Sequence, residues 1–188
     1  MLSPWACAAA DRLSLDHEKL LKQYKKKPLF DAGGLPVRLA CNRRTIEKII
    51  PQREPILLVD ALTGLDPEEG AISGSRLIDP ADSVFKGHFP DYPVYPGSYT
   101  LEMIGQLALC LYYFLEEKTT EVADDAAPVS ARATRIWGAY FLEPIPPGAK
   151  VELLAKKVDY SGYLATAIGQ ALVNDRVCCV FLGEVAIL

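Results

Sequence analysis

The longest hydrophobic stretch of the chain is LEMIGQLALCLYYFL, residues 101 to 115, and its apolar residues fall on nearly every side of the helix that they predict. A surface helix would show a single apolar stripe, so this helix is expected to be buried all round. With a length of about 22 Å at 1.5 Å per residue, it suits the core of a protein, because a membrane-spanning helix needs about 20 apolar residues.

Segments rich in branched and alternating apolar residues predict strands on both sides of this helix. Before it, ILLVDALTG at 56 to 64 and AISGSRLI at 71 to 78 are expected to pair as a hairpin. After it come ATRIWGAYFL, KVELLAKKVDY, YLATAIGQALV and RVCCVFLGEVAIL, with turn signals at Ser161-Gly162 and Asn174-Asp175. One hydrophobic helix and about six antiparallel strands predict an α+β domain whose sheet wraps around the helix.

The N-terminal part has a different character. Residues 11 to 27 carry leucines among charges and end at Pro28, which predicts a short amphipathic helix, and a linker follows. Residues 1–42 are therefore interpreted as an extension and residues 43–188 as a single domain, which begins with a brief helix in TIEKII. The lysine run at 25 to 27 is either a solvated face or a patch for an acidic partner.

Composition narrows the functional classes. The 188 residues are 50% hydrophobic and 23% charged, which is typical of one globular core. A net charge of -4 gives no general reason to expect nucleic acid as a partner. Five cysteines without CxxC spacing favour a reducing cytoplasm, and neither a signal peptide nor a membrane span is predicted.

Glu102 and Gln106 are the only strongly polar residues of the hydrophobic helix. They are four residues apart and so share one face of it. A buried carboxylate without a partner is costly, so Glu102 should face a cavity, pair with another group or be protonated. The alternative is an ordinary acidic residue near a helix N-terminus, where the dipole favours negative charge by about 0.3 to 1 kcal/mol.

The stretch GHFPDYPVYPG, residues 87 to 97, places one of only two histidines in a loop with three prolines. Such a loop has little freedom and suits a side chain that must be held in one place, although a lone histidine is more often structural. Gly97 follows at the apparent helix start, where backbone N–H groups lack intrahelical acceptors. His88, Glu102 and the Gly97 N–H are together the parts needed to remove a proton beside a carbonyl and to stabilise the resulting charge.

The stretch FKGHFPDYPVYPGSYTLEMIGQ resembles the active-site motif GHFPxxPVxPGxxxxExxxQ of the 3-hydroxyacyl-acyl-carrier-protein dehydratases of bacterial fatty-acid synthesis, which have the hotdog fold. Upstream, IIPQREPILLVD is similar to the family's L-P-H-R-x-P-x-L-L-V-D, with glutamine in place of histidine. Downstream, ATRIWGAYFLEPIPPGAKVELLAKKV is similar to an aromatic-rich strand, a turn and the next strand. The resemblance covers about residues 43 to 188.

This resemblance implies that His88 takes the proton from C2 of the thioester and that Glu102 gives a proton to the leaving 3-hydroxyl. The products would be a trans-2-enoyl chain and water, and the N–H of Gly97 would bind the thioester carbonyl. In the family the histidine and the glutamate of one site come from two subunits. A homodimer is therefore the expected active unit, and a trimer of dimers is left open. Glutamate rather than aspartate at position 102 favours dehydration without isomerisation.

Further residues are expected at the substrate: Gln106, Tyr95, Phe89 and Arg53. Gln106 is also expected to orient Glu102, whereas Arg53 is either structural or binds the phosphopantetheine arm. Tyr95 stands in place of the family's usual methionine, and Met103-Ile104-Gly105 replaces its alanine-rich triplet, which points to an altered acyl tunnel. The expected partner is acyl carrier protein, and no cofactor or metal is expected beyond the phosphopantetheine that carries the substrate.

Two other functions remain open from the sequence. A hotdog thioesterase would use a helix carboxylate to activate water and would not need the histidine loop. A non-catalytic partner subunit would bind an acyl chain or its carrier for another enzyme. The pathway, fatty-acid or polyketide synthesis, is also open.

Overall fold

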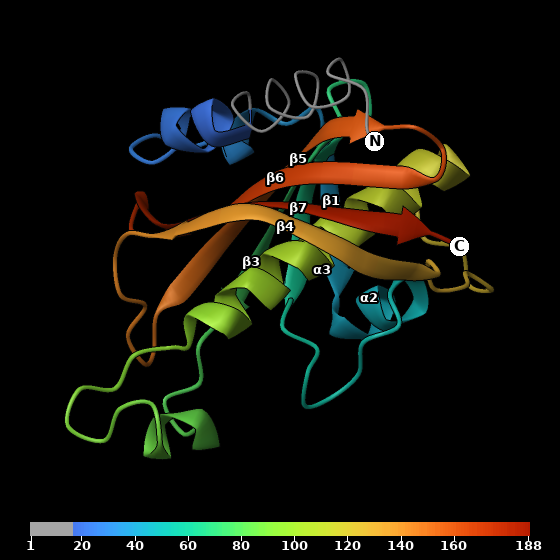
Figure 1. The fold of residues 1–188 in the computed structure, drawn as a ribbon. Helices are drawn as coiled ribbons and strands as arrows, with labels where there is room; N and C mark the ends of the chain where they lie inside the picture. Colours follow the sequence, from blue (N-terminus) through green and yellow to red (C-terminus); the bar gives the residue numbers. More distant parts are fainter. Residues whose placement is uncertain (1–16) are drawn as a thin grey trace, which may run out of the picture.

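The computed structural model describes residues 17–188, and in them one seven-stranded antiparallel sheet curves around a long helix (Figure 1). The sheet order is β1-β2-β3-β5-β6-β7-β4. The elements are β1 (Val37–Asn42), α2 (Arg43–Ile49), β2 (Ala61–Asp66), β3 (Ala71–Leu77), α3 (Gly97–Glu117), β4 (Ala131–Phe141), β5 (Lys150–Tyr160), β6 (Leu164–Val173) and β7 (Arg176–Ile187), with short 3-10 turns at Ala32–Gly34 and Ser83–Lys86. The α+β architecture predicted from the sequence is confirmed.

Helix α3 is the central helix, and at 21 residues it is longer than predicted at both ends. It begins directly after Pro96 and ends at Lys118, which has a left-handed conformation with φ of 50°. Most of its side chains are buried in the main core. The expectation of burial on all sides was wrong along one stripe, where Leu101, Gly105 and Ala108 are only half-buried because they face a cavity.

The predicted hairpin of β2 and β3 is present, and so are the four strands after α3. The first strand begins at Ala61, however, and not at residue 56. The backbone N–H groups of Leu57 and Leu58 are used by Arg53 O and by the side chain of Gln106, so they cannot join a strand ladder. The sheet also has one strand more than expected. This is β1, which comes from the segment interpreted as an extension and pairs with β2 at the sheet edge.

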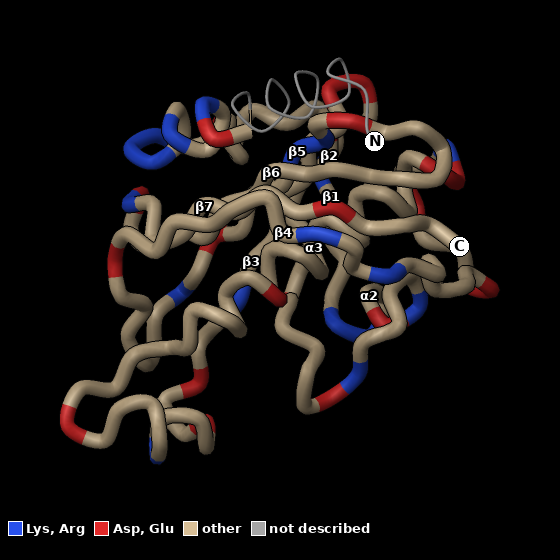
Figure 2. Tube along the Cα trace, viewed as in Figure 1, with Lys and Arg blue, Asp and Glu red and all other residues tan. Residues whose placement is uncertain are grey.

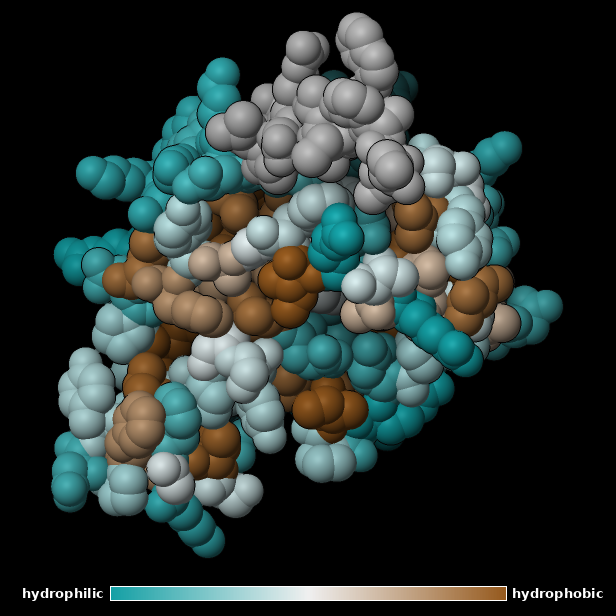
Figure 3. All heavy atoms as spheres, in the orientation of Figure 1, coloured by the Kyte–Doolittle hydropathy of each residue, from teal (hydrophilic) through white to brown (hydrophobic). Residues whose placement is uncertain are grey.

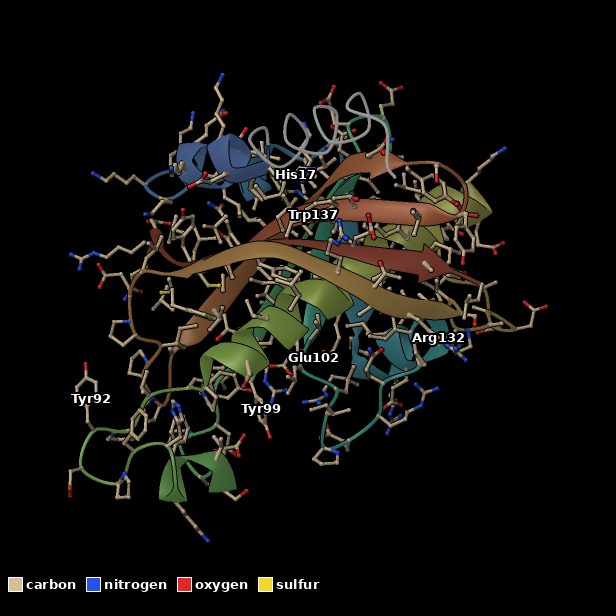
Figure 4. The ribbon with its side chains drawn as sticks, viewed as in Figure 1. His17, Tyr92, Tyr99, Glu102, Arg132 and Trp137 are labelled. Atoms are coloured by element: carbon tan, nitrogen blue, oxygen red, sulfur yellow. The ribbon has the colours of Figure 1, made fainter. Side chains whose placement is uncertain are left out.

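The N-terminal segment lies across the sheet face that is opposite to α3 (Figure 1). Residues 17–23 form a helix, and Leu21 packs against Val180 and Leu182 of β7. Of the predicted amphipathic helix, residues 11–16 lie outside the described residues. The ring of His17 in this helix contacts the ring of Trp137 on β4 in a tilted arrangement, with a centroid distance of 4.2 Å (Figure 4). The segment therefore covers apolar positions of β4, β6 and β7.

A buried glutamine on β6 attaches this segment to the sheet. Gln170 is fully buried, accepts a hydrogen bond from Leu29 N at 2.8 Å and donates to the carbonyls of Tyr24 at 2.6 Å and Lys27 at 2.9 Å. Lysines gather at the nearby turn (Figure 2), and Lys25 lies 4.0 Å from the centre of the Tyr140 ring. No helix in residues 17–188 has the length and apolar character needed to span a membrane.

We expect Gln170→Leu to lower the free energy of unfolding by roughly 1 to 3 kcal/mol, because three backbone groups would lose their buried partner. Urea unfolding followed by circular dichroism measures the change. Gln23→Leu, on an exposed position of the same N-terminal helix, is the matched control and should have little effect. Equal stability of both variants and the wild type would show that the segment is not held by Gln170.

Candidate active site

His88 is held by the backbone of its own loop. The backbone N–H of His88 donates to Val84 O at 3.0 Å. The Nδ1 atom of its ring lies 2.8 Å from Val94 O. Because a carbonyl oxygen only accepts hydrogen bonds, Nδ1 carries a proton, and in the neutral ring the lone pair is therefore on Nε2. Phe89 stacks on the ring at a centroid distance of 4.1 Å. The loop thus holds the ring in the tautomer whose Nε2 faces away from this hydrogen bond and is available as a base.

The N-terminus of α3 lies beside this histidine. His88, Tyr95 and Gly97 line a common cavity of about 470 Å³. The first N–H groups of α3 have no acceptor inside the helix and point along the positive end of its dipole. A side chain at position 97 would clash with the ring of Phe141, since an added Cβ would lie 2.6 Å from it. A larger residue would therefore require the exposed Phe141 ring to move, and the Gly97 N–H is a candidate donor to a carbonyl oxygen.

Tyr95 is the residue that departs from the family's methionine. It is only 3% exposed and packs against Phe85 and Tyr99. Burial raises the pKa of Tyr95 to about 12, so the phenol stays neutral near pH 7. Its hydroxyl is buried and has no hydrogen-bond partner within residues 17–188.

Glu102 lies on α3 (Figure 4) and lines a second cavity, of about 290 Å³, whose walls also include Tyr112. Apart from Glu102, its walls are mostly apolar or small side chains: Leu101, Gly105 and Ala108 of α3, Ala165 and Ala167 of β6, and Phe181 and Val185 of β7. Of the three alternatives expected for Glu102, the structure shows that it faces a cavity and that it also has a hydrogen-bond partner.

The carboxylate of Glu102 is oriented by two amide side chains. Gln106 Nε2 donates to Glu102 Oε1 at 2.8 Å, which is the predicted contact one turn along the helix. Gln52 Nε2 approaches the same oxygen at 3.4 Å. The sequence reasoning did not select Gln52 as a site residue. The available signal was its position in IIPQREP, where the family motif has a histidine and this chain has glutamine.

Gln106 is itself fixed by the backbone. Its Oε1 accepts from Leu58 N at 2.7 Å, and its Nε2 also donates to Ile56 O at 2.7 Å. Both hydrogens on Gln106 Nε2 are therefore used, one by Ile56 O and one by Glu102. In this arrangement Gln106 orients Glu102 and has no hydrogen left for a substrate. Arg53 is exposed and donates to the carbonyls of Ile50 and Gln52, so in this arrangement it stabilises its own loop.

The structure brings His88, Tyr95 and Gly97 together at one cavity and places Glu102 at the other. Within one chain, the base and the acid thus face different spaces, which share only Ser98 in their walls. Edge strand β4 reaches both, through Ile136 beside Glu102 and Phe141 beside His88.

A curved sheet around one helix, with a loop histidine before that helix and a carboxylate within it, defines a hotdog-fold protein with an acid–base site. Residues 50–181 match the family model of the FabA-like domain, and the chain belongs to this family. It is 35% identical over 130 residues to the 3-hydroxyacyl-[acyl-carrier-protein] dehydratase FabZ of Sulfurimonas denitrificans, covering 69% of this chain and 85% of that relative. It is 34% identical to the FabZ of Halalkalibacterium halodurans, covering 70% and 87%.

Solved structures share the fold at much lower identity. The dehydratase heterocomplex ApeI:P from Xenorhabdus doucetiae matches with a TM-score of 0.58 at 10% identity, over 76% of this chain and 90% of that one. The HP0420 homologue from Helicobacter felis matches with a TM-score of 0.52 at 10% identity, over 73% and 82%. These two likenesses concern the architecture alone.

Proposed function

We propose that this protein dehydrates 3-hydroxyacyl thioesters carried on acyl carrier protein to trans-2-enoyl thioesters. The observation that carries the proposal is the pair formed by His88, with a free Nε2, and Glu102, oriented by Gln106, in a chain that belongs to the FabA-like family. The curated relatives at about 35% identity support the same reaction, since their names specify this dehydration.

The chemistry follows from the roles of these groups. His88 Nε2 takes a proton from C2, the electron pair forms the C2–C3 double bond, and the C3–O bond breaks. Glu102, in its protonated form, gives its proton to the departing hydroxyl, which leaves as water. The N–H of Gly97 donates to the thioester oxygen, where negative charge develops. One proton then returns from the imidazolium to the carboxylate, which restores the starting state.

The cavity along α3 is the space proposed for the acyl chain. It extends from Glu102 to Tyr112, about 15 Å at 1.5 Å per residue. Tyr112 is buried, and its hydroxyl donates to Thr166 O at 2.9 Å, so it forms a fixed wall at the far end. The apolar lining suits a hydrocarbon chain, and the carboxyl group lies at the opposite end from this wall.

A homodimer is part of the proposal. Strand β4 is the last strand of the described sheet, and its 11 residues present a free edge. Ile136 and Phe141 are 61% and 59% exposed, and hydrophobic side chains gather over one half of β4 (Figure 3), whereas its first half carries the exposed Arg132 and Arg135. A second copy that pairs along β4 would lie at both cavities, which supports a site made of His88 from one chain and Glu102 from the other.

Location and carrier complete the proposal. The four cysteines in the described residues are all free thiols, which supports the cytoplasm. The substrate arrives on the phosphopantetheine of the carrier, and the reaction as written needs no redox cofactor. Both fatty-acid and polyketide chains fit this chemistry, because each carries a hydroxyl on C3 and an acidic hydrogen on C2.

Mass spectrometry of carrier-bound substrates tests this function. Purified protein is incubated with 3-hydroxybutanoyl and 3-hydroxydecanoyl carrier protein, and with the matching trans-2-enoyl forms. Loss or gain of one water on the intact thioester is the expected result. Release of free acid would instead identify a thioesterase, and unchanged substrates would favour the partner-subunit function.

The width of the acyl cavity gives a further prediction. An added Cβ at Gly105 would meet nothing within 4 Å, so Gly105→Leu should fold and fill the cavity one turn beyond Glu102. We expect kcat/KM for 3-hydroxydecanoyl substrates to fall by at least about tenfold, with little change for 3-hydroxybutanoyl. Helix stability should not fall, because leucine is a better helix former than glycine.

Gly105→Ala is the matched control for this experiment, because it gives a similar gain in helix propensity with one methyl group. Steady-state kinetics with the two chain lengths separate the variants. An unchanged preference in Gly105→Leu would mean that the acyl chain lies elsewhere.

A further inference from the structure

Gln52 contacts Glu102 from outside α3. It follows helix α2 in the loop before β2, and its Nε2 lies 3.4 Å from Glu102 Oε1. This is long for an N–H···O bond, so it is the weaker of the two amide contacts on that oxygen. Its own Oε1 is buried and has no partner within residues 17–188. Buried polar atoms without partners are uncommon, and a role in a functional site is one of the reasons for them.

The orientation of the stronger contact is determined by the backbone. Gln106 cannot exchange its oxygen and nitrogen, because Leu58 N must find an acceptor and Ile56 O must find a donor. Gln106 therefore always presents an N–H to Glu102 Oε1. An oxygen that receives this N–H is an acceptor whether the carboxyl group is charged or neutral. In the neutral acid, the carbonyl oxygen is the better acceptor, so this N–H favours the arrangement in which the proton lies on Oε2.

We propose that Gln52 and Gln106 act together as a two-amide clamp that keeps Oε1 as an acceptor and places the transferable proton of Glu102 on Oε2. No hydrogen bond to Oε2 is found within the described residues, and Glu102 lines the acyl cavity, so Oε2 is the oxygen left for the substrate hydroxyl. Gln52 is then a positioning residue for proton delivery. This inference rests on the proposed dehydration.

The test replaces Gln52 with methionine, which has a similar size and no N–H group. We expect kcat to fall by up to about tenfold, the upper range for loss of one hydrogen bond between neutral groups, with KM within about twofold. Gln52→His is the rescue variant, because its ring can donate one N–H from the same position. It should recover most of the lost kcat. Melting temperatures of both variants monitor the fold.

A double-mutant cycle separates positioning from a structural role. In a Glu102→Gln background there is no acidic proton to place, so Gln52→Met should cause no further loss of the residual rate. A loss of the same size in both backgrounds would show that Gln52 acts independently of Glu102 and would overturn the clamp. Wild-type kcat in Gln52→Met would overturn it as well.

These outcomes differ from a failure of the proposed function. If the wild-type protein dehydrates no carrier-bound 3-hydroxyacyl chain, both the dehydratase assignment and the clamp are wrong. If the wild type is active and only the Gln52 results disagree, the dehydratase assignment stands without the clamp.

Discussion

His88→Ala is expected to abolish the interconversion of 3-hydroxyacyl and trans-2-enoyl thioesters, with a loss of kcat of about 10³-fold. The reason is that Nε2 is the only ring nitrogen with a free lone pair, since Nδ1 donates to Val94 O. No other imidazole lines the cavity with Gly97. Mass spectrometry of the carrier-bound products measures the loss over a time course.

His88→Asn is the second variant. It tests whether the loss in His88→Ala comes from the missing base or from a disturbed loop. The asparagine amide can still donate to Val94 O, yet it offers no basic nitrogen. Both variants should be inactive, and both should keep the wild-type melting temperature within a few degrees.

Tyr92→Ala is the matched control in the same loop. Tyr92 is 64% exposed and points away from the body of the protein (Figure 4). We expect it to keep near wild-type kcat. Full dehydratase activity in His88→Asn would require another base and would refute the assignment of His88.

Much of the fold follows from the sequence because its signals are local. A fifteen-residue run with apolar residues on nearly every side predicted α3, and the dipeptides Ser161-Gly162 and Asn174-Asp175 marked the turns beside β6. What it did not predict depends on distant contacts. The strand expected at residue 56 starts later because the Gln106 side chain, 48 positions away, takes the N–H of Leu58. Strand β1 is short, and it was missed because its pairing with β2 is not visible in its own residues.

In the site, too, the residues with local sequence signals were predicted and those that depend on distant contacts were not. His88, Gly97 and Glu102 were selected from motif spacing and residue chemistry. The Gln106 contact followed from helical periodicity. Gln52 was missed because its approach to Glu102 spans 50 positions and depends on the course of the loop after α2. The open space at Gly105 was equally hidden, since it results from small residues on β6 and β7 that face the helix.

The arrangement of the two cavities predicts a large difference in activity between two kinds of heterodimer. His88 and Glu102 of one chain face different cavities, and β4 contributes to both. If each site combines His88 of one chain with Glu102 of the other, a dimer of a His88→Ala chain and a Glu102→Gln chain has one intact site. Its other site lacks both groups. We therefore expect about half of the wild-type activity from this heterodimer.

Co-expression with two different affinity tags, followed by tandem purification, isolates the heterodimer, and the mass-spectrometric assay then measures its rate. The homodimers of each variant should be inactive. The reciprocal control pairs a wild-type chain with a chain that carries both substitutions. In the cross-chain arrangement each of its sites lacks one group, so this heterodimer should be inactive too.

A site contained in one chain gives the opposite pattern. The two single variants would then form only inactive sites, whereas the wild-type chain paired with the double variant would keep half of the activity. The heterodimer that is active in one arrangement is inactive in the other. Loss of folding in one variant therefore cannot imitate either result. An active first heterodimer with an inactive second one would establish that each site combines His88 of one chain with Glu102 of the other.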